Sequence, residues 1–249
     1  GSIILCTDGD CRVPSSWVST FVAYFEDHAP EMVSGPVKMN SHDWFGHYQA
    51  LDFSSLIGFG ASTLKNGVAS TCNGANMAYR KSVFEEVNGY EGNDQLPSGD
   101  DEFLLQKIHK YYPGKVVFLK STAAVVSTIP KLTVSSFIQQ RIRWSSKWRF
   151  HNSLWVKGAA IWSYLDAVSV FVLVGFTIAS SISVAMAFAI LLTRYLAEAY
   201  YLHLTSQFFS LNASKRHYAL VSIIYPFYVF FLGFASIFGH YSWKGRRYH

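Results

Sequence analysis

Residues Ile3–Asp10 read Ile-Ile-Leu-Cys-Thr-Asp-Gly-Asp, and this segment is the strongest indication of the fold class. Its apolar run is short and is ended by an acidic turn, a pattern typical of a buried strand. Pro14 suits the first turn of a helix, and Trp17, Phe21 and Phe25 then recur at helical spacing. A strand followed by an acidic turn and a helix predicts an α/β fold.

Further elements are predicted along the chain. Residues 30–75 read as mixed structure, with glycine breaks at Gly58, Gly60, Gly67 and Gly74. Helices are expected at residues 81–87 and 98–111, and an amphipathic helix at 132–150. Strands rich in β-branched residues are expected at 115–119 and 123–127.

Three long apolar segments dominate the rest of the sequence, at residues 161–179, 182–203 and 218–238. Each approaches the roughly 20 residues that a helix needs to cross a bilayer. Arg194 and Glu198 stand four residues apart in the second segment and can neutralise each other. The sequence therefore predicts about three transmembrane helices.

The charge is divided along the chain. Residues 1–102 contain 14 Asp/Glu and 5 Lys/Arg, a net charge of −9, whereas residues 103–249 contain 2 Asp/Glu and 16 Lys/Arg, a net charge of +14. Basic residues beside apolar spans indicate the cytoplasmic face of a membrane. Nucleic-acid binding is the weaker explanation of the high pI, because the positive charges end at hydrophobic spans.

The three cysteines are Cys6, Cys11 and Cys72, and no CxxC spacing occurs. Neither a disulfide framework nor a zinc site is indicated. A reduced part of the protein that faces the cytosol is the simpler interpretation.

The first group of candidate site residues is Asp8-Gly9-Asp10. Two carboxylates one residue apart at the end of a strand can share a divalent cation and a diphosphate, and oxygen ligands suit Mg²⁺ or Mn²⁺. Such a metal would neutralise charge on a nucleoside-diphosphate leaving group. The alternative is an ordinary polar turn.

The second group is Asp100 and Asp101, at the start of the helix expected from Ser98. A carboxylate there is well placed as a general base. The alternative is a capping box between Ser98 and Asp101, with the acids of the first turn favoured by the helix dipole.

The third group is Gln140, Arg143 and Trp144 in the basic amphipathic helix. Gln140 and Arg143 can bind donor phosphate, and Trp144 can stack on a sugar ring. The alternative is a helix that lies on lipid headgroups.

The order and spacing of the three groups resemble the signature of family 2 glycosyltransferases. The membrane-bound branch with cellulose, hyaluronan and ceramide-glucosyl synthases is the most similar. Four other stretches support the resemblance, namely residues 8–14, 72–81, 88–90 and 243–246.

The resemblance implies a GT-A (Rossmann-like) fold, a nucleotide-sugar donor such as a UDP-sugar, and inversion at the anomeric carbon. Asp8 and Asp10 would contact the donor diphosphate and the metal, Mg²⁺ or Mn²⁺. Asp101 would be the base, with Asp100 beside it. The donor site would be closed by Gln140, Arg143 and Trp144.

The expected architecture has three parts. Residues 1–130 form the C-terminal part of a GT-A catalytic domain, residues 131–157 an amphipathic interface helix, and residues 158–249 the transmembrane region. In the family, another strand and the nucleotide-base pocket precede the DxD strand, so we expect that section to lie upstream of Gly1. Without it, weak or absent donor binding is expected.

The expected protein is multi-pass in the membrane, with its catalytic domain facing the cytoplasm. Its acceptor is a lipid, a lipid-linked precursor or a polysaccharide, and the small number of spans favours a lipid or lipid-linked acceptor.

Two other function classes remain open. A phosphatase of the haloacid dehalogenase type would use Asp8 as nucleophile, Asp10 as acid and the stretch Gly99–Asp101 as a late metal site. A membrane scaffold or transporter fragment would instead use Asp166, Arg194 and Glu198 within its spans.

Overall fold

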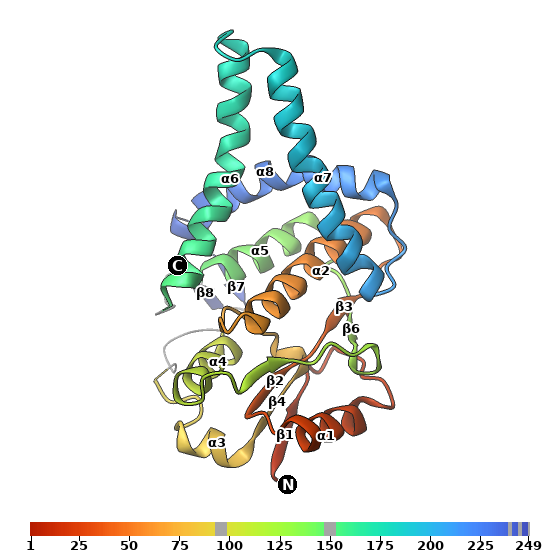
Figure 1. Cartoon of the computed structure of the whole chain (residues 1–249), viewed down its shortest axis with the longest axis vertical. Helices are drawn as coiled ribbons and strands as arrows, with labels where there is room; N and C mark the ends of the chain where they lie inside the picture. Colours follow the sequence, from red (N-terminus) through yellow and green to blue (C-terminus); the bar gives the residue numbers. More distant parts are fainter. Residues whose placement is uncertain (93–98, 147–152, 239–240, 244–245, 249) are drawn as a thin grey trace. The chain divides into compact units, whose positions relative to one another are not determined.

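The computed structural model of the chain describes residues 1–92, 99–146, 153–238, 241–243 and 246–248. The chain forms two compact units. One consists of residues 1–130 with 208–211, and the other of residues 131–207 with 212–249. Figure 1 shows the mixed sheet of the first unit and the long helices of the second.

A four-stranded sheet forms the centre of the first unit. Its strand order is β1 (Ile3–Cys6), β4 (Met77–Arg80), β2 (Met32–Ser34) and β5 (Val116–Phe118). β4 runs antiparallel to β1 and β2, whereas β2 and β5 are parallel. A separate parallel pair joins β3 (Val37–Met39) to β6 (Val126–Thr128). The predicted α/β class is therefore confirmed.

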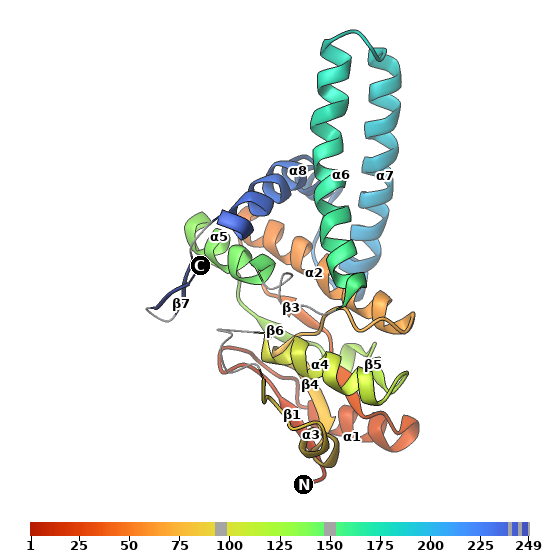
Figure 2. The same cartoon turned by 90° about the vertical axis from the view of Figure 1, so that its left-hand side faces the viewer.

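Helices cover both faces of the four-stranded sheet (Figure 2). Met77 and Tyr79 of β4 join the core formed with α3 (Lys81–Glu86) and α4 (Asp100–Tyr111). Successive strand side chains point to opposite faces. Arg80 accordingly lies on the other face, with its guanidinium 5.5 Å from the ring centroid of Phe25 in α1 (Trp17–His28).

The predicted glycine breaks at Gly58 and Gly60 are wrong, because α2 (Trp44–Lys65) runs through both positions. Asp43 caps this helix, and its carboxylate accepts the N–H of Gly46 at 2.6 Å. A Cβ at Gly60 would lie 3.1 Å from Thr71 Cγ2 and 3.3 Å from the Thr71 carbonyl. The glycine thus allows a close tertiary contact that outweighs its low helix propensity.

Other predicted elements form with shifted boundaries. The helix expected at residues 81–87 is α3, the helix at 98–111 is α4, and the strand at 115–119 is β5. The strand expected at 123–127 is only partly correct, because the short 3₁₀ helix η2 (Thr122–Ala124) occupies its first residues and β6 follows. Another short 3₁₀ helix, η1 (Gly74–Asn76), precedes β4.

The second unit consists mainly of helices. They are α5 (Val134–Ser145), α6 (Leu154–Ile178), α7 (Val184–Phe208) and α8 (Lys215–Phe238), followed by the antiparallel pair β7 (Tyr241–Trp243) and β8 (Arg246–Tyr248). α5 packs on α8, where the rings of Phe137 and Tyr228 stack with centroids 5.7 Å apart. Residues 147–150 of the predicted amphipathic helix lie outside the described residues.

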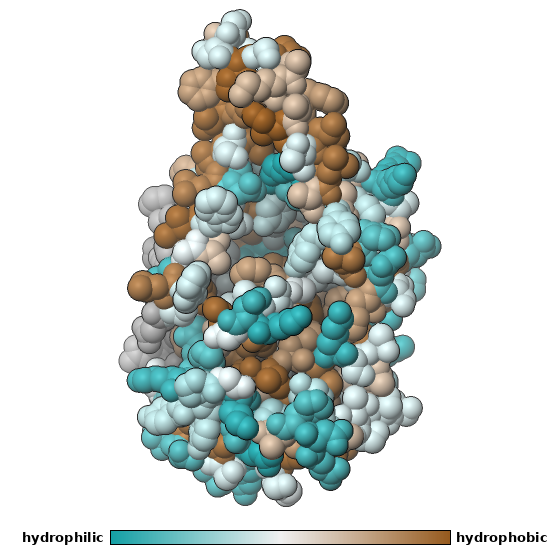
Figure 3. All heavy atoms as spheres, viewed as in Figure 1, coloured by the Kyte–Doolittle hydropathy of each residue, from teal (hydrophilic) through white to brown (hydrophobic). Residues whose placement is uncertain are grey.

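The three long helices form where apolar segments were predicted. Within the described residues, two stretches, Leu154–Ile178 and Lys215–Ser236, are long and apolar enough to cross a membrane. α7 contains Arg194 and Glu198, which make it less apolar than the other two. Figure 3 shows mainly hydrophobic side chains over the α6–α7 hairpin, whereas the surface of the first unit is mixed.

An ion-pair cluster joins α6 to α7. Arg194 Nη2 lies 2.8 Å from Asp166 Oδ2 and 2.7 Å from Glu198 Oε1. The pair of Arg194 and Glu198 predicted from their spacing is thus confirmed, and Asp166 of α6 adds a second carboxylate. One positive charge between two negative ones reduces the cost of placing these groups among apolar helices.

Candidate functional site

The loop Asp8–Arg12 follows β1 directly. The Cys11 N–H donates to the Asp8 carbonyl at 3.0 Å and so closes a tight turn. Asp8 and Asp10 are exposed, and the ligand atoms of these carboxylates and of the Cys11 thiol all lie within 4.8 Å of one another. The polar-turn and metal-site interpretations are therefore compatible. The backbone makes the turn, and the two carboxylates remain close enough to share a cation.

The far end of this loop is held by β6. Arg12 and Ser127 form an isolated antiparallel bridge, with N–H to carbonyl distances of 2.8 and 2.9 Å. Burial raises the pKa of the Cys11 thiol, and the negative charges of Asp10 and Asp8 act in the same direction. The thiolate form of Cys11 is therefore disfavoured near neutral pH.

Asp101 lies in the first turn of α4. Its Oδ2 accepts the N–H of Gly74 at 2.8 Å, and its Oδ1 accepts the N–H of Glu102 at 3.0 Å. The cap residue of α4 is Gly99, which has a φ of 107° and makes no side-chain cap bond, and the capping box between Ser98 and Asp101 stays a prediction. Ser98 lies outside the described residues. The Asp101 carboxylate is directed at the segment before β4.

A second hydrogen bond ties that segment to α4. Thr71 Oγ1 donates to Glu102 Oε1 at 2.7 Å. A Cβ at Gly74 would lie 3.3 Å from Asp101 Oδ2, so a glycine gives the carboxylate the space to approach the backbone. Asp101 is half-buried, and Asp100 is exposed.

The sheet brings the Asp8–Arg12 loop and the Asp101 carboxylate to one end. Cys6, the last residue of β1, pairs with Met77, the first residue of β4. η1, which contains Gly74, leads directly into Met77. The chain therefore leaves β1 into the acidic loop at the same end of the sheet where Gly74 holds Asp101.

Gln140, Arg143 and Trp144 are half-buried on α5 in the second unit. The Gln140 Oε1 atom is buried and has no hydrogen-bond partner among the described residues. The guanidinium of Arg141 lies 4.4 Å from the Trp144 ring centroid and 4.9 Å from that of Phe137. Trp144 thus contacts a cation of its own helix. Joint action of this group with Asp8, Asp10 and Asp101 stays a prediction.

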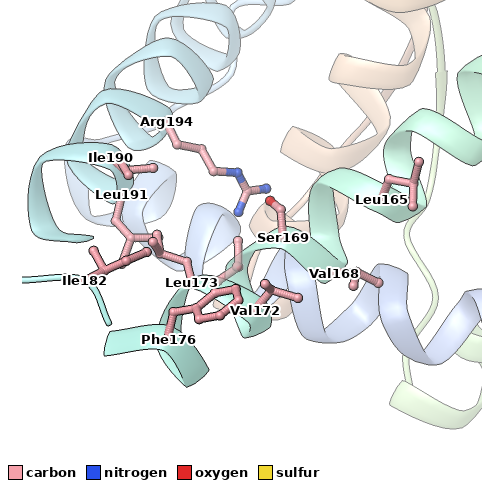
Figure 4. Close-up of a pocket in the computed structure, with 11 residues that line it drawn as sticks. Leu165, Val168, Ser169, Val172, Leu173, Phe176, Ile182, Ile190, Leu191 and Arg194 are labelled. Atoms are coloured by element: carbon pink, nitrogen blue, oxygen red, sulfur yellow. The ribbon is translucent and has the colours of Figure 1, made fainter. Parts of the chain in front are cut away.

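An apolar groove of about 480 Å³ lies between α6 and α7. Figure 4 shows Arg194 extending from α7 toward Ser169 of α6, with Leu173 and Phe176 among the apolar residues nearby. None of the three groups of candidate site residues lines this groove. The groove thus offers apolar contacts beside an ion-paired arginine, but its lining residues include no set of reactive groups.

The two exposed carboxylates after the first strand of this mixed α/β unit fit a divalent cation, which proteins commonly hold with one or two carboxylates and the phosphates of a substrate. A family model described as glycosyl transferase family group 2 matches residues 3–234, and the chain belongs to this family. No curated protein matches the chain.

Membership of this family implies glycosyltransferase activity, with a nucleotide-sugar donor and an acceptor. The match favours the resemblance seen in the sequence over the two alternatives. The matched family is a transferase family, and the match extends over most of both units. It therefore supports neither the phosphatase nor the scaffold interpretation.

Sequence reasoning missed three residues that shape the candidate site. Gly74 and Asn76 lie in the stretch 72–81 that carries the family resemblance, but their partners are distant in the sequence. Arg141, the third residue, lies between Gln140 and Arg143 but was not among the candidate site residues. The spacing of Phe137, Arg141 and Trp144 places them on one helix face and could have indicated the contact of a cation with two rings.

Proposed function

We propose that the protein is an inverting GT-A glycosyltransferase, in which Asp101 takes the proton from an acceptor hydroxyl. The observation that carries this proposal is the anchoring of the Asp101 carboxylate by the Gly74 and Glu102 N–H groups, at the end of the sheet where the Asp8–Arg12 loop begins.

The anchoring suits a general base. Each carboxylate oxygen accepts one backbone N–H, and these two bonds fix the orientation of the side chain that would take the proton. As Asp101 takes the proton, the acceptor oxygen forms a bond to the anomeric carbon of the donor sugar. The bond from that carbon to the diphosphate oxygen breaks on the opposite face, so that the configuration inverts and a nucleoside diphosphate leaves.

The loop of Asp8 and Asp10 fits a divalent cation. Two exposed carboxylates within reach of one ion offer the oxygen donors that Mg²⁺ and Mn²⁺ prefer. When bound, such an ion supplies positive charge against the departing diphosphate. The residues' own contribution is to hold the ion at the end of β1, with the loop fixed by the bridge between Arg12 and Ser127.

Gln140, Arg143 and Trp144 are proposed to close the donor site. Arg143 offers paired donors for phosphate oxygens, and the buried Oε1 of Gln140 can accept a hydrogen bond from the donor. Trp144 offers an aromatic ring on which a sugar can stack, and the Arg141 guanidinium lies 4.4 Å from the ring centroid.

Membrane anchoring by the second unit completes the proposal. The two apolar helices support it, as do the basic residues that precede α6, because Lys and Arg accumulate on the cytoplasmic side. We infer a cytoplasmic catalytic unit, a multi-pass membrane anchor and a lipid, lipid-linked or glycan acceptor, with a lipid or lipid-linked acceptor favoured.

The test is sugar transfer by the full-length, membrane-embedded protein, including any section of the natural protein that lies upstream of Gly1. A panel of radiolabelled UDP-sugars is supplied with Mn²⁺ and a total lipid extract, and label is followed into the lipid and polymer fractions. Transfer from one donor that stops with EDTA and returns with added Mn²⁺ is the expected result. Formation of an aspartyl-phosphate trapped by beryllofluoride, without any sugar transfer, would point to the phosphatase instead.

A further inference from the structure

Asn76 is a fully buried side chain of the first unit, with a relative exposure of 0%. Its Nδ2 donates to the carbonyls of Pro36 and Ala124, each at 2.8 Å. Its Oδ1 accepts the indole N–H of Trp17 at 2.9 Å. A buried amide is costly unless it is hydrogen-bonded, so these three bonds define one position for the side chain.

The backbone of Asn76 is held as firmly as its side chain. Its carbonyl accepts the N–H of Gly35 at 2.7 Å, and its N–H donates to the Asn73 carbonyl at 2.9 Å. A Cβ at Gly35 would lie 2.5 Å from Asn76 Nδ2. The segment between β2 and β3 therefore needs a glycine at position 35, because a side chain there would overlap with Asn76.

The position of Asn76 determines the position of Gly74. The two residues belong to the same short helix, η1, and the Asn73 side chain caps it by accepting the Ala75 N–H at 3.0 Å. Gly74 in turn donates its N–H to Asp101. A displacement of Asn76 therefore also moves Gly74, whose N–H binds the carboxylate of Asp101.

Asn76 also holds two segments that flank the C-terminal end of the Asp8–Arg12 loop. On one side, Trp17 is the first residue of α1, the helix that follows the loop. On the other side, Ala124 ends η2, and the chain continues from there into β6, where Ser127 bridges to Arg12. Ser16 Oγ strengthens this arrangement by donating to the Ala123 carbonyl at 2.8 Å.

We propose that Asn76 is a positioning residue, which fixes the carboxylate of Asp101 relative to the cation-binding loop of Asp8 and Asp10. The inference rests on the proposed function for these three acids. Asn76 itself is buried and touches no substrate. It acts through Gly74 on one side and through Trp17 and Ala124 on the other.

The experiment compares two variants with a matched control. Asn76→Ala removes all three side-chain bonds, and Trp17→Phe removes only the indole N–H that binds Asn76. The control is Asn66→Ala, because Asn66 is exposed and donates to the Ser62 carbonyl at the end of α2. Each protein is assayed for hydrogen exchange of the peptide 71–80, for Mn²⁺ affinity by calorimetry, and for kcat and KM of sugar transfer.

In Trp17→Phe we expect faster exchange in the peptide 71–80, because loss of the indole bond loosens η1. We expect kcat to fall by about 10–100-fold with little change in KM, since a small misplacement of a catalytic group reduces the reaction rate by factors of this size. Asn76→Ala should show larger changes in the same direction, and Asn66→Ala should show none. If Asn76→Ala does not fold, Trp17→Phe alone carries the test.

Unchanged exchange of the peptide 71–80 in folded Trp17→Phe, with kcat and Mn²⁺ affinity within about twofold of the wild type, would overturn the inference. Absence of sugar transfer and of Mn²⁺ binding in the wild type would count against the proposed function. The exchange measurement would still decide whether Asn76 holds the segment of Gly74.

Discussion

The carboxylate of Asp101 accepts one backbone N–H at each of its oxygens. Hydrogen bonds to an ionised acceptor are stronger than those between neutral groups, so the side chain is held in one orientation. A general base must keep its oxygen within about 3 Å of the group that it deprotonates. The orientation supplied by Gly74 and Glu102 is therefore what the proposed role of Asp101 as base requires.

Replacement of this carboxylate is the first prediction. Asp101→Asn should lower kcat of sugar transfer by about 10²–10⁴-fold, the contribution typical of a general base. Steady-state kinetics measure the loss, and thermal unfolding shows whether the variant is folded. The control is Asp27→Asn, because Asp27 is exposed near the end of α1. Full activity of a folded Asp101→Asn protein would show that Asp101 is not the base.

The second prediction concerns the cation. Asp10→Ala should weaken Mn²⁺ binding by more than about tenfold, since even indirect supporting groups of metal sites account for losses of that size. Calorimetry with Mn²⁺ alone measures the change, and Asp27→Asn again serves as the control. Equal Mn²⁺ affinity in the wild type and in Asp10→Ala would show that the ion binds elsewhere.

At the scale of elements, the packing of α6 on α8 depends on one small residue. A Cβ at Gly233 would lie 2.3 Å from Cε2 of Tyr164. The Tyr164 ring also stacks on Phe230, with centroids 6.1 Å apart and an interplanar angle of 11°. Ser163 and Tyr225 add a hydrogen bond of 3.2 Å between the same two helices.

The third prediction tests this contact. Gly233→Ala should destabilise the protein by about 1–3 kcal/mol, because the added methyl group displaces the Tyr164 ring from a packed interface. Gly175→Ala is the matched control, since Gly175 of α6 has no atom within 4 Å of an added Cβ. Thermal unfolding in detergent should show a lower Tm for Gly233→Ala only. Equal Tm values would mean that the α6–α8 contact does not limit stability.

At the scale of the whole molecule, the chain combines an acidic first part with a basic and apolar remainder. Trp155 and Trp162 are exposed near the start of α6, where aromatic side chains suit the membrane–water boundary. All three cysteines, which are free thiols, belong to the first unit. Thiol labelling can therefore report the side of the membrane on which that unit lies.

The fourth prediction is the orientation of the first unit. A membrane-impermeant maleimide should label inverted membrane vesicles and spare sealed right-side-out vesicles. Because burial raises the pKa of the Cys6 and Cys11 thiols, Ser19→Cys provides an exposed reporter on α1. Mass spectrometry locates the label. Labelling of this reporter in right-side-out vesicles would contradict a cytoplasmic catalytic unit.

Elements governed by short-range patterns were predictable. β1 and α1 follow from an apolar run and from aromatic residues at helical spacing, and both form as expected. α2 was missed because its glycines lower helix propensity, whereas the close contact of Gly60 with Thr71 is a tertiary effect. The partner of Asp101 was missed for a similar reason, since Gly74 stands 27 residues away in the sequence.

The class of the protein follows from the sequence alone, because the order of strand, acidic turn, helix and apolar segments is a local property of the chain. The same motifs predict Asp8, Asp10 and Asp101 as site residues, and their roles stay predictions. How the carboxylate of Asp101 is held, and at which end of the sheet it lies, is visible only in the folded protein. These features depend on strand pairing and on hydrogen bonds between distant segments, which no local pattern encodes.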